Sequence, residues 1–214
     1  MSFEEKRYSL VKKLRDQGYI KTKKVIEAMR KVPRHLFLPQ NKRDKAYLDR
    51  PLPIGKNQTI SAPHMVGLLV EKLDPEPNDK VLEIGGGSGY NAAVIAETLD
   101  EGRVYSIEKI DSIAHQAKQN LQKTGYSGKV ELIIADGSTG YEEKAPYDRI
   151  LLTAGAPEVP KPLEEQLAEN GKIVGPVGGK RRQKLVIGKK KKGKVKYKKE
   201  GRCAFVPLRG RYGY

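Results

Sequence analysis

The fold is decided by residues 81–90, which read Val81-Leu-Glu-Ile-Gly-Gly-Gly-Ser-Gly-Tyr90. The run Val-Leu-Glu-Ile is short and mostly apolar, which predicts a buried strand. Four glycines in the next five residues predict a tight turn in which the backbone can approach a ligand closely. Residues 91–99 then have the composition of a helix. The stretch therefore predicts a strand, a ligand-binding loop and a helix in succession.

The same alternation continues along the chain after residue 79. Strands alternating with helices of about 10–15 residues predict a parallel sheet covered on both faces. The expected strands are residues 81–84, 104–107, 130–134, 147–153 and 172–175, and the expected helices are 91–99, 112–123 and 162–170. We therefore expect an α/β fold with a doubly wound, mostly parallel sheet.

The flanking segments have a different character. Helices are expected over residues 8–17 and 22–31, whereas residues 34–59 show little periodicity and are expected to wrap around the domain. After the sheet, residues 184–188 and 194–197 are expected to form a β-hairpin. We expect a single domain over residues 1–214, made of an N-terminal helical segment (1–78), an α/β core (79–175) and C-terminal strands (176–214).

Composition excludes several classes of protein. Hydrophobic residues make up 37% and charged residues 32% of the chain, as in globular proteins. No apolar run approaches the roughly 18 residues that cross a bilayer, and no apolar segment follows the charged N-terminus, so we expect no export signal and a cytoplasmic location. The single cysteine, Cys203, excludes a disulfide framework. The three histidines lack the spacing of metal ligands, so we expect no metal.

The net charge of +16 is concentrated in one segment. Residues 180–199 contain twelve Lys or Arg and no Asp or Glu, which leaves +4 on the other 194 residues. Such a run indicates either a contact with nucleic acid or another acidic partner, or a solvated hairpin whose lysines prevent edge-to-edge pairing.

Polar residues and glycines stand where the predicted strands end. In open α/β sheets, ligands bind beyond the carboxyl ends of the strands. Besides the loop 85–89, these positions hold Glu108, which could accept hydrogen bonds from both hydroxyls of a ribose, and Asp136-Gly137, where Asp136 could accept one from an adenine amino group. Each could instead be a cap or a strand-ending turn.

The glycine loop matches two nucleotide-binding patterns. From Glu83 it has the form E-x-G-x-G-x-G, through Gly85, Gly87 and Gly89, which is typical of methyltransferases. From Gly87 it also satisfies the G-x-G-x-x-A pattern of dinucleotide-binding enzymes. These residues alone favour a methyltransferase and leave a dehydrogenase open.

Further segments resemble signatures of the protein-L-isoaspartate (D-aspartate) O-methyltransferase family. They occur in the family's order and cover nearly the whole chain. The segments are Val32–Pro39, Gln58–Met65, Val81–Tyr90, Ala145–Ile150, Thr153–Pro157 and Phe205–Gly210. The resemblance implies a class I methyltransferase fold, S-adenosyl-L-methionine as cofactor with S-adenosyl-L-homocysteine as product, and repair of isoaspartyl residues in damaged proteins.

The resemblance also implies roles for individual residues. Ser61 matches the family's active-site serine, although a serine before Pro63 could simply cap the following helix. The residues implied to bind the cofactor are Thr59, Ile60, His64, Glu83, Gly85, Gly87, Gly89, Glu108, Asp136 and Gly137. On the substrate side, Ser61 is joined by a strand containing Ala204, Val206 and Leu208, whose backbone could hold an extended peptide.

The proposed chemistry needs neither a metal nor a general base. The free carboxylate of an isoaspartyl residue is ionised near neutral pH, because its pKa is about 4, and the sulfonium methyl group is already activated. Ser61 is expected to orient the carboxylate. By family analogy the methyl ester then closes to a succinimide without the enzyme.

One departure and two rival functions stand beside this interpretation. Gly86 occupies a position where the family more often has threonine or another larger residue, which is expected to loosen the loop. The basic segment 180–199 would suit an RNA methyltransferase on the same fold, or an inactive nucleic-acid-binding protein. We expect a monomer that acts on isoaspartyl peptides and proteins and does not bind membranes.

Overall fold

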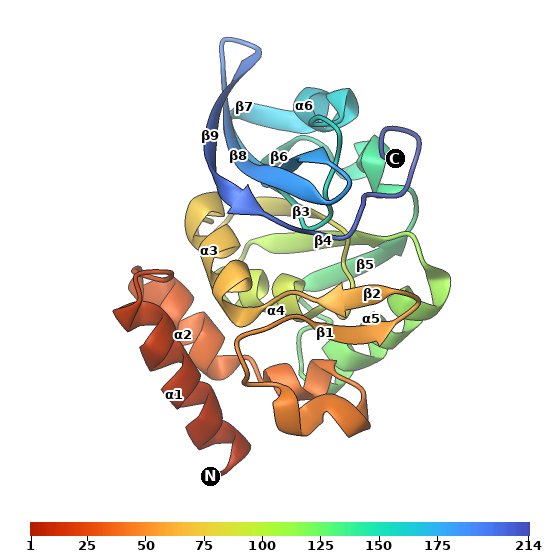
Figure 1. Ribbon diagram of the computed structural model, residues 1–214. Coiled ribbons are helices and arrows are strands. Elements are labelled where there is room, and N and C mark those ends of the chain that lie inside the picture. The colour runs from red at the N-terminus through yellow and green to blue at the C-terminus, as the bar shows by residue number, and fades with distance from the viewer.

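A seven-stranded sheet forms the centre of the computed structural model, which describes residues 1–214 (Figure 1). The strand order is β5-β4-β3-β6-β7-β8-β9. The strands are β3 (Lys80–Ile84), β4 (Arg103–Glu108), β5 (Val130–Ile134), β6 (Tyr147–Leu152), β7 (Leu167–Gly179), β8 (Arg182–Lys191) and β9 (Lys194–Cys203). Strands β3 to β7 pair in parallel, and β7, β8 and β9 pair antiparallel. The predicted α/β fold with a mostly parallel sheet and a C-terminal hairpin is confirmed.

The connections place a ligand-binding crevice beside β3. After β3 the chain proceeds outward through β4 to the edge strand β5, and then returns to β6 on the other side of β3. The order of strands therefore reverses between β3 and β6, and at such a point the loops at the carboxyl ends separate and leave room for a ligand.

The helices cover the two faces of the sheet unequally. One face packs against α3 (Pro63–Leu73), α4 (Tyr90–Glu97) and α5 (Asp111–Lys123). Helix α2 (Lys23–Lys31) packs on α3 and α4, and α1 (Phe3–Asp16) packs on α2, so that all five helices share a core of 36 buried residues. The other face, with 13 buried residues, is covered by the short helix α6 (Lys161–Gln166), loops and C-terminal residues. Neighbouring residues divide between the cores: Val81 belongs to the first and Leu82 to the second, because successive strand residues point to opposite faces.

The first helix begins earlier than predicted. Residues 8–17 were expected to be helical, but α1 starts at Phe3 because Ser2 and Glu5 form a capping box: the Ser2 hydroxyl accepts from the Glu5 N–H, and the Glu5 carboxylate accepts from the Ser2 N–H. This S-x-x-E signal is present in the sequence and locates the helix start.

The segment 34–59 contains regular structure that periodicity did not indicate. It forms two 3-10 helices, η1 (Arg34–Phe37) and η2 (Gln40–Lys45), and the strand β1 (Leu52–Gly55), which pairs with β2 (Gln58–Ile60). Lys56 and Asn57 both have positive φ at the hairpin turn, at 49° and 57°. Two such residues are what a two-residue β-hairpin turn requires, and asparagine tolerates this conformation well.

The predicted helix 162–170 is too long. Helix α6 ends at Gln166, and Leu167 already begins β7 by pairing with Tyr147. Leu167 is 1% exposed, so burial in the second core outweighs the local helical pattern. The hairpin predicted over residues 184–197 is present as β8 and β9, both longer than expected. No helix combines the length and apolar character needed to cross a membrane.

Candidate active site

A cavity opens at the carboxyl ends of β3, β4 and β6, with about 830 Å³ of empty space when the part open to solvent is included. Segments from distant parts of the chain line it: β2 and the residue after it, the glycine loop, the ends of β4 and β6, and the C-terminal segment. Its lining includes Gln58, Thr59, Ile60, Ser61, Gly85, Gly86, Gly87, Ser88, Tyr90, Asn91, Glu108, Lys109, Ile110, Gly137, Thr153, Ala154, Val206, Pro207, Leu208 and Arg209. Most residues that the sequence predicted for the site therefore meet in one cavity.

The glycine loop has a backbone that only glycine adopts easily. Gly85, Gly87 and Gly89 have φ values of 95°, 53° and 84°, in the left-handed region. A Cβ on Gly85 would lie 2.6 Å from the Thr153 hydroxyl oxygen, which accounts for the smallest side chain at that position. Gly89 is the residue before α4, so the loop delivers the N-terminus of this helix beside the cavity.

Gly86 is explained by a neighbour on β4. A Cβ on Gly86 would lie 2.6 Å from the Ser106 hydroxyl oxygen and 3.0 Å from a methyl carbon of Leu132. The Ser106 hydroxyl is itself fixed, because it donates to the Glu83 carboxylate, and Ser106 is completely buried. The expectation that glycine loosens the loop is therefore replaced by a packing reason: Ser106 occupies the space of a larger side chain.

This packing predicts the effect of restoring threonine. Gly86→Thr is expected to destabilise the protein by about 1–3 kcal/mol, the usual cost of forcing extra atoms into a packed core. Adding Ser106→Ala should recover part of that loss by removing the clashing oxygen. Thermal unfolding of the two single variants and the double variant measures the coupling. If the stability change of the double variant equalled the sum of the changes of the two single variants, this explanation would be contradicted.

Glu83 is a buried carboxyl group beneath the loop. It is 0% exposed, and its two oxygens accept from Asn91 Nδ2 (2.7 Å) and from the Ser106 hydroxyl. Burial raises the pKa of Glu83 to about 7, against the opposing effect of these two hydrogen bonds. It does not line the cavity; instead it connects β3, β4 and the first turn of α4, and so supports the loop from below.

The raised pKa predicts a pH dependence of stability. Between pH 4.5, the ordinary value, and about 7, the folded state binds more protons at Glu83 than the unfolded state does. Stability therefore falls as pH rises through this window. Glu83→Gln removes the titration, so the melting temperature of wild type relative to this variant should decrease from pH 5 to pH 8. A constant difference across that range would show that Glu83 ionises normally in the folded protein.

Glu108 lies at the end of β4 and lines the cavity. One carboxylate oxygen accepts from the Gly87 N–H at 2.9 Å and the other from the Ile110 N–H at 2.8 Å. Each oxygen keeps a further lone pair, since a carboxylate can accept about four hydrogen bonds. Glu108 thus fixes the glycine loop and still offers two acceptors to a pair of hydroxyl groups.

Ser61 lines the same cavity, together with Thr59 and Ile60. It is not the cap of α3: Ala62 holds that position and Pro63 begins the helix. The Ser61 hydroxyl makes no hydrogen bond within the protein, so it is free to bind a group in the cavity.

Sequence comparison places the chain in a known family. A model of the family described as protein-L-isoaspartate (D-aspartate) O-methyltransferase matches residues 5–213. The protein-L-isoaspartate O-methyltransferase of Methanopyrus kandleri is 52% identical over 214 residues, covering 99% of this chain and 95% of the relative. An Archaeoglobus fulgidus protein of the same description, numbered 2, is 50% identical over 100% of this chain and 97% of its own length. The chain belongs to the protein-L-isoaspartate O-methyltransferase family.

Solved structures agree with this membership in the isoaspartyl methyltransferase family. A Plasmodium falciparum protein assigned as a protein-L-isoaspartate O-methyltransferase, crystallised with S-adenosyl-L-homocysteine, superposes with a TM-score of 0.86 at 26% identity, covering 95% of this chain and 98% of that one. Another structure with the family's name superposes with a TM-score of 0.88 at 32% identity, covering 97% of this chain and 67% of that one. These findings support the isoaspartyl methyltransferase interpretation over an RNA methyltransferase or a dehydrogenase. No cluster of three or more His, Cys, Asp or Glu side chains could hold a metal ion.

Asp136 and His64, which the family resemblance assigned to the cofactor, lie outside the cavity lining. Although burial opposes it, hydrogen bonds from Ser138 and from the Arg211 N–H lower the pKa of Asp136. Its carboxylate accepts from the Ser138 N–H and hydroxyl, the Arg211 N–H (2.8 Å) and Lys109 Nζ (3.2 Å), which leaves little capacity for an adenine amino group. His64 instead contacts Asp49 through its backbone N–H and Nδ1, both at 2.9 Å.

The C-terminal segment is held across the cavity by backbone hydrogen bonds. Gly155 N–H donates to the Val206 carbonyl at 2.8 Å, and Leu208 N–H donates to the Gly155 carbonyl at 2.7 Å. Val206 and Leu208 line the cavity as predicted, whereas Ala204 precedes the segment and does not. Because these backbone groups already pair with Gly155, a peptide would have to use the opposite edge of the segment.

Several lining residues were not predicted from the sequence. Tyr90, Asn91, Thr153 and Arg209 come from the start of α4, the end of β6 and the C-terminal segment. The Thr153 hydroxyl donates to the Gly85 carbonyl at 2.6 Å, which fixes the loop from the β6 side. The position of Thr153 after the last residue of β6 was a usable signal, since strand ends on both sides of the crevice contribute to such sites.

Proposed function

We propose that this protein transfers a methyl group from S-adenosyl-L-methionine to the free carboxylate of L-isoaspartyl residues, and also of D-aspartyl residues, in damaged proteins. The observation that carries the proposal is one cavity that is lined by Glu108, by the glycine loop and by Ser61, whose hydroxyl is unpaired. One part of this lining suits a nucleoside and the other a carboxylate. Family membership over residues 5–213 supports the substrate.

The cavity fits the cofactor on its own chemistry. Glu108 offers two acceptors to ribose hydroxyls, and the loop at Gly85 and Gly87 allows the backbone to approach closely. The N-terminus of α4 favours a negatively charged group beside the loop. We assign Thr59, Ile60, Gly85, Gly87, Glu108 and Gly137 to direct cofactor binding, and Glu83, Gly89, His64 and Asp136 to supporting the walls of the cavity.

The residues of the chain position the reactants. S-adenosyl-L-methionine supplies an activated methyl group on a sulfonium sulfur. Ser61 donates a hydrogen bond to one oxygen of the substrate carboxylate and directs the other toward the methyl carbon. Val206 and Leu208 hold the peptide on the same side of the cavity. The carboxylate is ionised near neutral pH, so no side chain has to remove a proton, and orientation supplies up to about 7–11 kcal/mol in well-aligned reactions.

A labelling experiment tests this function. The protein is incubated with methyl-labelled S-adenosyl-L-methionine and matched peptides that carry aspartate or isoaspartate, with tRNA as a separate acceptor. Base-labile label on the isoaspartyl peptide alone is the expected result, because a carboxyl methyl ester hydrolyses in base. Label on tRNA and none on peptide would overturn the proposal.

We also propose a monomer in the cytoplasm that folds as one domain. The larger core joins residues of α1 and α2 to those of the sheet, so the N-terminal segment shares the hydrophobic core of the rest. The single cysteine, Cys203, is half-buried and unpaired, which suits a reducing compartment.

A further inference from the structure

The hairpin of β8 and β9, called here the ribbon, forms the edge of the sheet and has two faces that differ. Strand β8 pairs with β7 as far as Lys189, and beyond this pair β8 and β9 continue to the turn as two strands. The register of the ribbon pairs Lys189 with Lys196, Lys191 with Lys194, and Ile187 with Lys198. Residues paired directly across strands share a face, as do residues two apart along a strand. One face of the ribbon therefore carries five lysines, called here the lysine face: Lys189, Lys191, Lys194, Lys196 and Lys198.

The opposite face fastens the ribbon to the body of the protein. The Tyr197 hydroxyl donates to the Glu164 carboxylate at 2.5 Å, and Lys190 Nζ donates to the carbonyl oxygens of Leu167 and Glu164 at 2.7 and 2.8 Å. At the turn, the Glu169 carboxylate accepts from the backbone N–H of Lys192 at 2.6 Å. The ribbon is thus held by α6 and β7, and the lysine face is directed away from α6.

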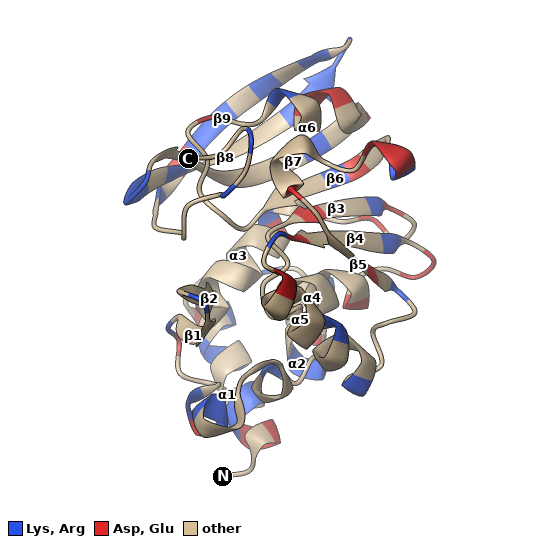
Figure 2. Ribbon diagram, turned by 90° about the vertical axis from the view of Figure 1, so that its right-hand side faces the viewer, with Lys and Arg blue, Asp and Glu red and all other residues tan.

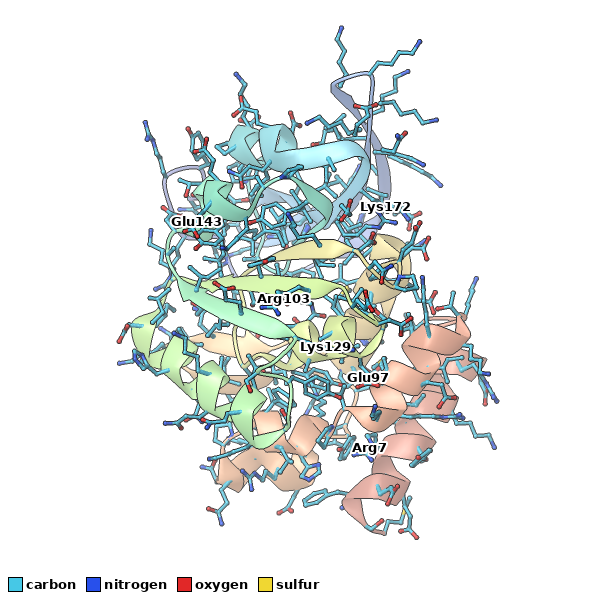
Figure 3. The ribbon with its side chains drawn as sticks, turned by 180° about the vertical axis from the view of Figure 1, so that it is seen from behind. Arg7, Glu97, Arg103, Lys129, Glu143 and Lys172 are labelled. Atoms are coloured by element: carbon cyan, nitrogen blue, oxygen red, sulfur yellow. The ribbon has the colours of Figure 1, made fainter.

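The lysine face lacks compensating negative charge. Of its five members only Lys198 lies within 4.0 Å of a carboxylate, that of Glu200 at 3.7 Å, and Glu200 is already paired with Lys72 at 2.8 Å. Figure 2 shows the blue of Lys and Arg recurring along β8 and β9, interrupted by uncharged residues. In Figure 3, side chains with nitrogen ends extend from the hairpin into solvent, and Lys172 lies near its base.

The lysines also repel one another. Lysines directly opposite each other destabilise an antiparallel pair, and this ribbon has two such pairs in succession. Lys172 of β7 stands in register beside Lys189, which extends the row to a third strand. Burial is the main cause that lowers the pKa of Lys172, and the positive charges of Arg149 and Lys189 add to it, whereas Asp74, which pairs with Lys172 at 3.4 Å, opposes the shift. An anionic partner would relieve the repulsion between the lysines, which remains in the isolated protein.

The ribbon is separate from the active site. Its turn lies beyond the pairing of Lys189 with Lys172, near the start of β7, whereas the cavity opens at the carboxyl ends of the parallel strands. No residue of β8 or β9 lines the cavity. A partner bound at the lysine face would leave the cavity accessible.

We propose that the lysine face binds duplex DNA through its phosphates, independently of sequence. Beyond the pair of Lys172 with Lys189 the ribbon has only two strands, and a two-stranded β-ribbon fits the major groove of B-form DNA. Lysines are point charges suited to phosphates. Single-stranded nucleic acid is bound with the help of stacking aromatic side chains, but the one aromatic residue of the ribbon, Tyr197, belongs to the opposite face. Double-stranded RNA has a deep, narrow major groove that does not admit the ribbon.

The salt dependence follows from the number of lysines. Each neutralised phosphate contributes about −0.9 to the slope of log K against log salt concentration. Five contacts give a slope of about −4.5, and removing three lysines should make it shallower by about 2.7.

The test is titration of a fluorescent DNA duplex with the full chain between 50 and 300 mM salt. The ribbon variant carries Lys191→Gln, Lys194→Gln and Lys196→Gln. The matched control carries Lys12→Gln, Lys45→Gln and Lys118→Gln, which remove the same charge from exposed positions on η2 and on helices α1 and α5. Thermal unfolding, and methylation of an isoaspartyl peptide that has no charged side chain besides the isoaspartyl carboxylate, show that both variants are folded.

We expect the ribbon variant to bind the duplex about tenfold or more weakly at low salt and to show the shallower slope. The affinity of the control should change by less than about twofold. Equal losses in both variants would overturn the proposal, because net charge alone would then explain binding. Stronger binding of single-stranded RNA, or of poly-L-glutamate, than of the duplex would overturn it as well, in favour of an RNA or an acidic protein as the partner.

Discussion

Replacing Glu108 with alanine is expected to weaken binding of S-adenosyl-L-methionine about 100-fold or more. Hydrogen bonds to a charged group contribute about 1.5–3 kcal/mol each, and the two oxygens of Glu108 offer one to each ribose hydroxyl. A loss of about 3 kcal/mol already exceeds 100-fold in affinity. The variant also releases the N–H groups of Gly87 and Ile110, which hold the glycine loop in place.

Isothermal titration with S-adenosyl-L-homocysteine measures the effect directly. Glu108→Gln keeps a single acceptor oxygen, so its affinity for S-adenosyl-L-homocysteine should lie between those of the wild type and of Glu108→Ala. Glu101→Ala is the matched control, since Glu101 is exposed and lies outside the cavity lining. Wild-type affinity in a folded Glu108→Ala variant would exclude Glu108 as the ribose-binding residue.

Replacing Ser61 with alanine is expected to lower kcat/KM for an isoaspartyl peptide about 10- to 100-fold and to leave the affinity for S-adenosyl-L-homocysteine unchanged. One hydrogen bond to the substrate carboxylate accounts for this range. Because the Ser61 hydroxyl has no partner within the protein and does not cap α3, its removal should not disturb the fold.

Three controls define the role of Ser61. Ser61→Thr keeps the hydroxyl and should retain more activity than alanine, and Ser127→Ala, in an exposed turn, should behave as wild type. The rate with Ser61→Ala should show the same pH profile as wild type, since the serine orients the carboxylate and does not transfer a proton. A new dependence on pH would indicate that Ser61 acts in proton transfer.

Local sequence was sufficient to predict the strands of the parallel part of the sheet. Strands buried on both faces, such as β3, appear as short apolar runs. The edge strand β5 is less buried but is also mostly apolar, and it was predicted with its observed limits, Val130–Ile134. The loop after β3 and Glu108 at the end of β4 were found because the carboxyl ends of parallel strands meet at one edge. The family segments Gln58–Met65 and Phe205–Gly210 added other lining residues, which no local pattern identifies as part of a cavity.

Features that depend on contacts between residues distant in the sequence were decided only by the tertiary structure. Leu167 could have continued a helix, but pairing with Tyr147 and burial made it the start of β7. The sequence alone does not show whether Asp136 binds adenine or the C-terminal segment. The N–H of Arg211, 75 residues away, donates to its carboxylate, and this contact is seen only in the folded chain. From residue 79 onward the sequence by itself determined the order of strands and helices along the chain and the chemistry available at strand ends, because these follow from local propensity and periodicity. The tertiary structure decided which of those groups remain free for a ligand, because each hydrogen-bonding group can be used by a partner that only folding brings near.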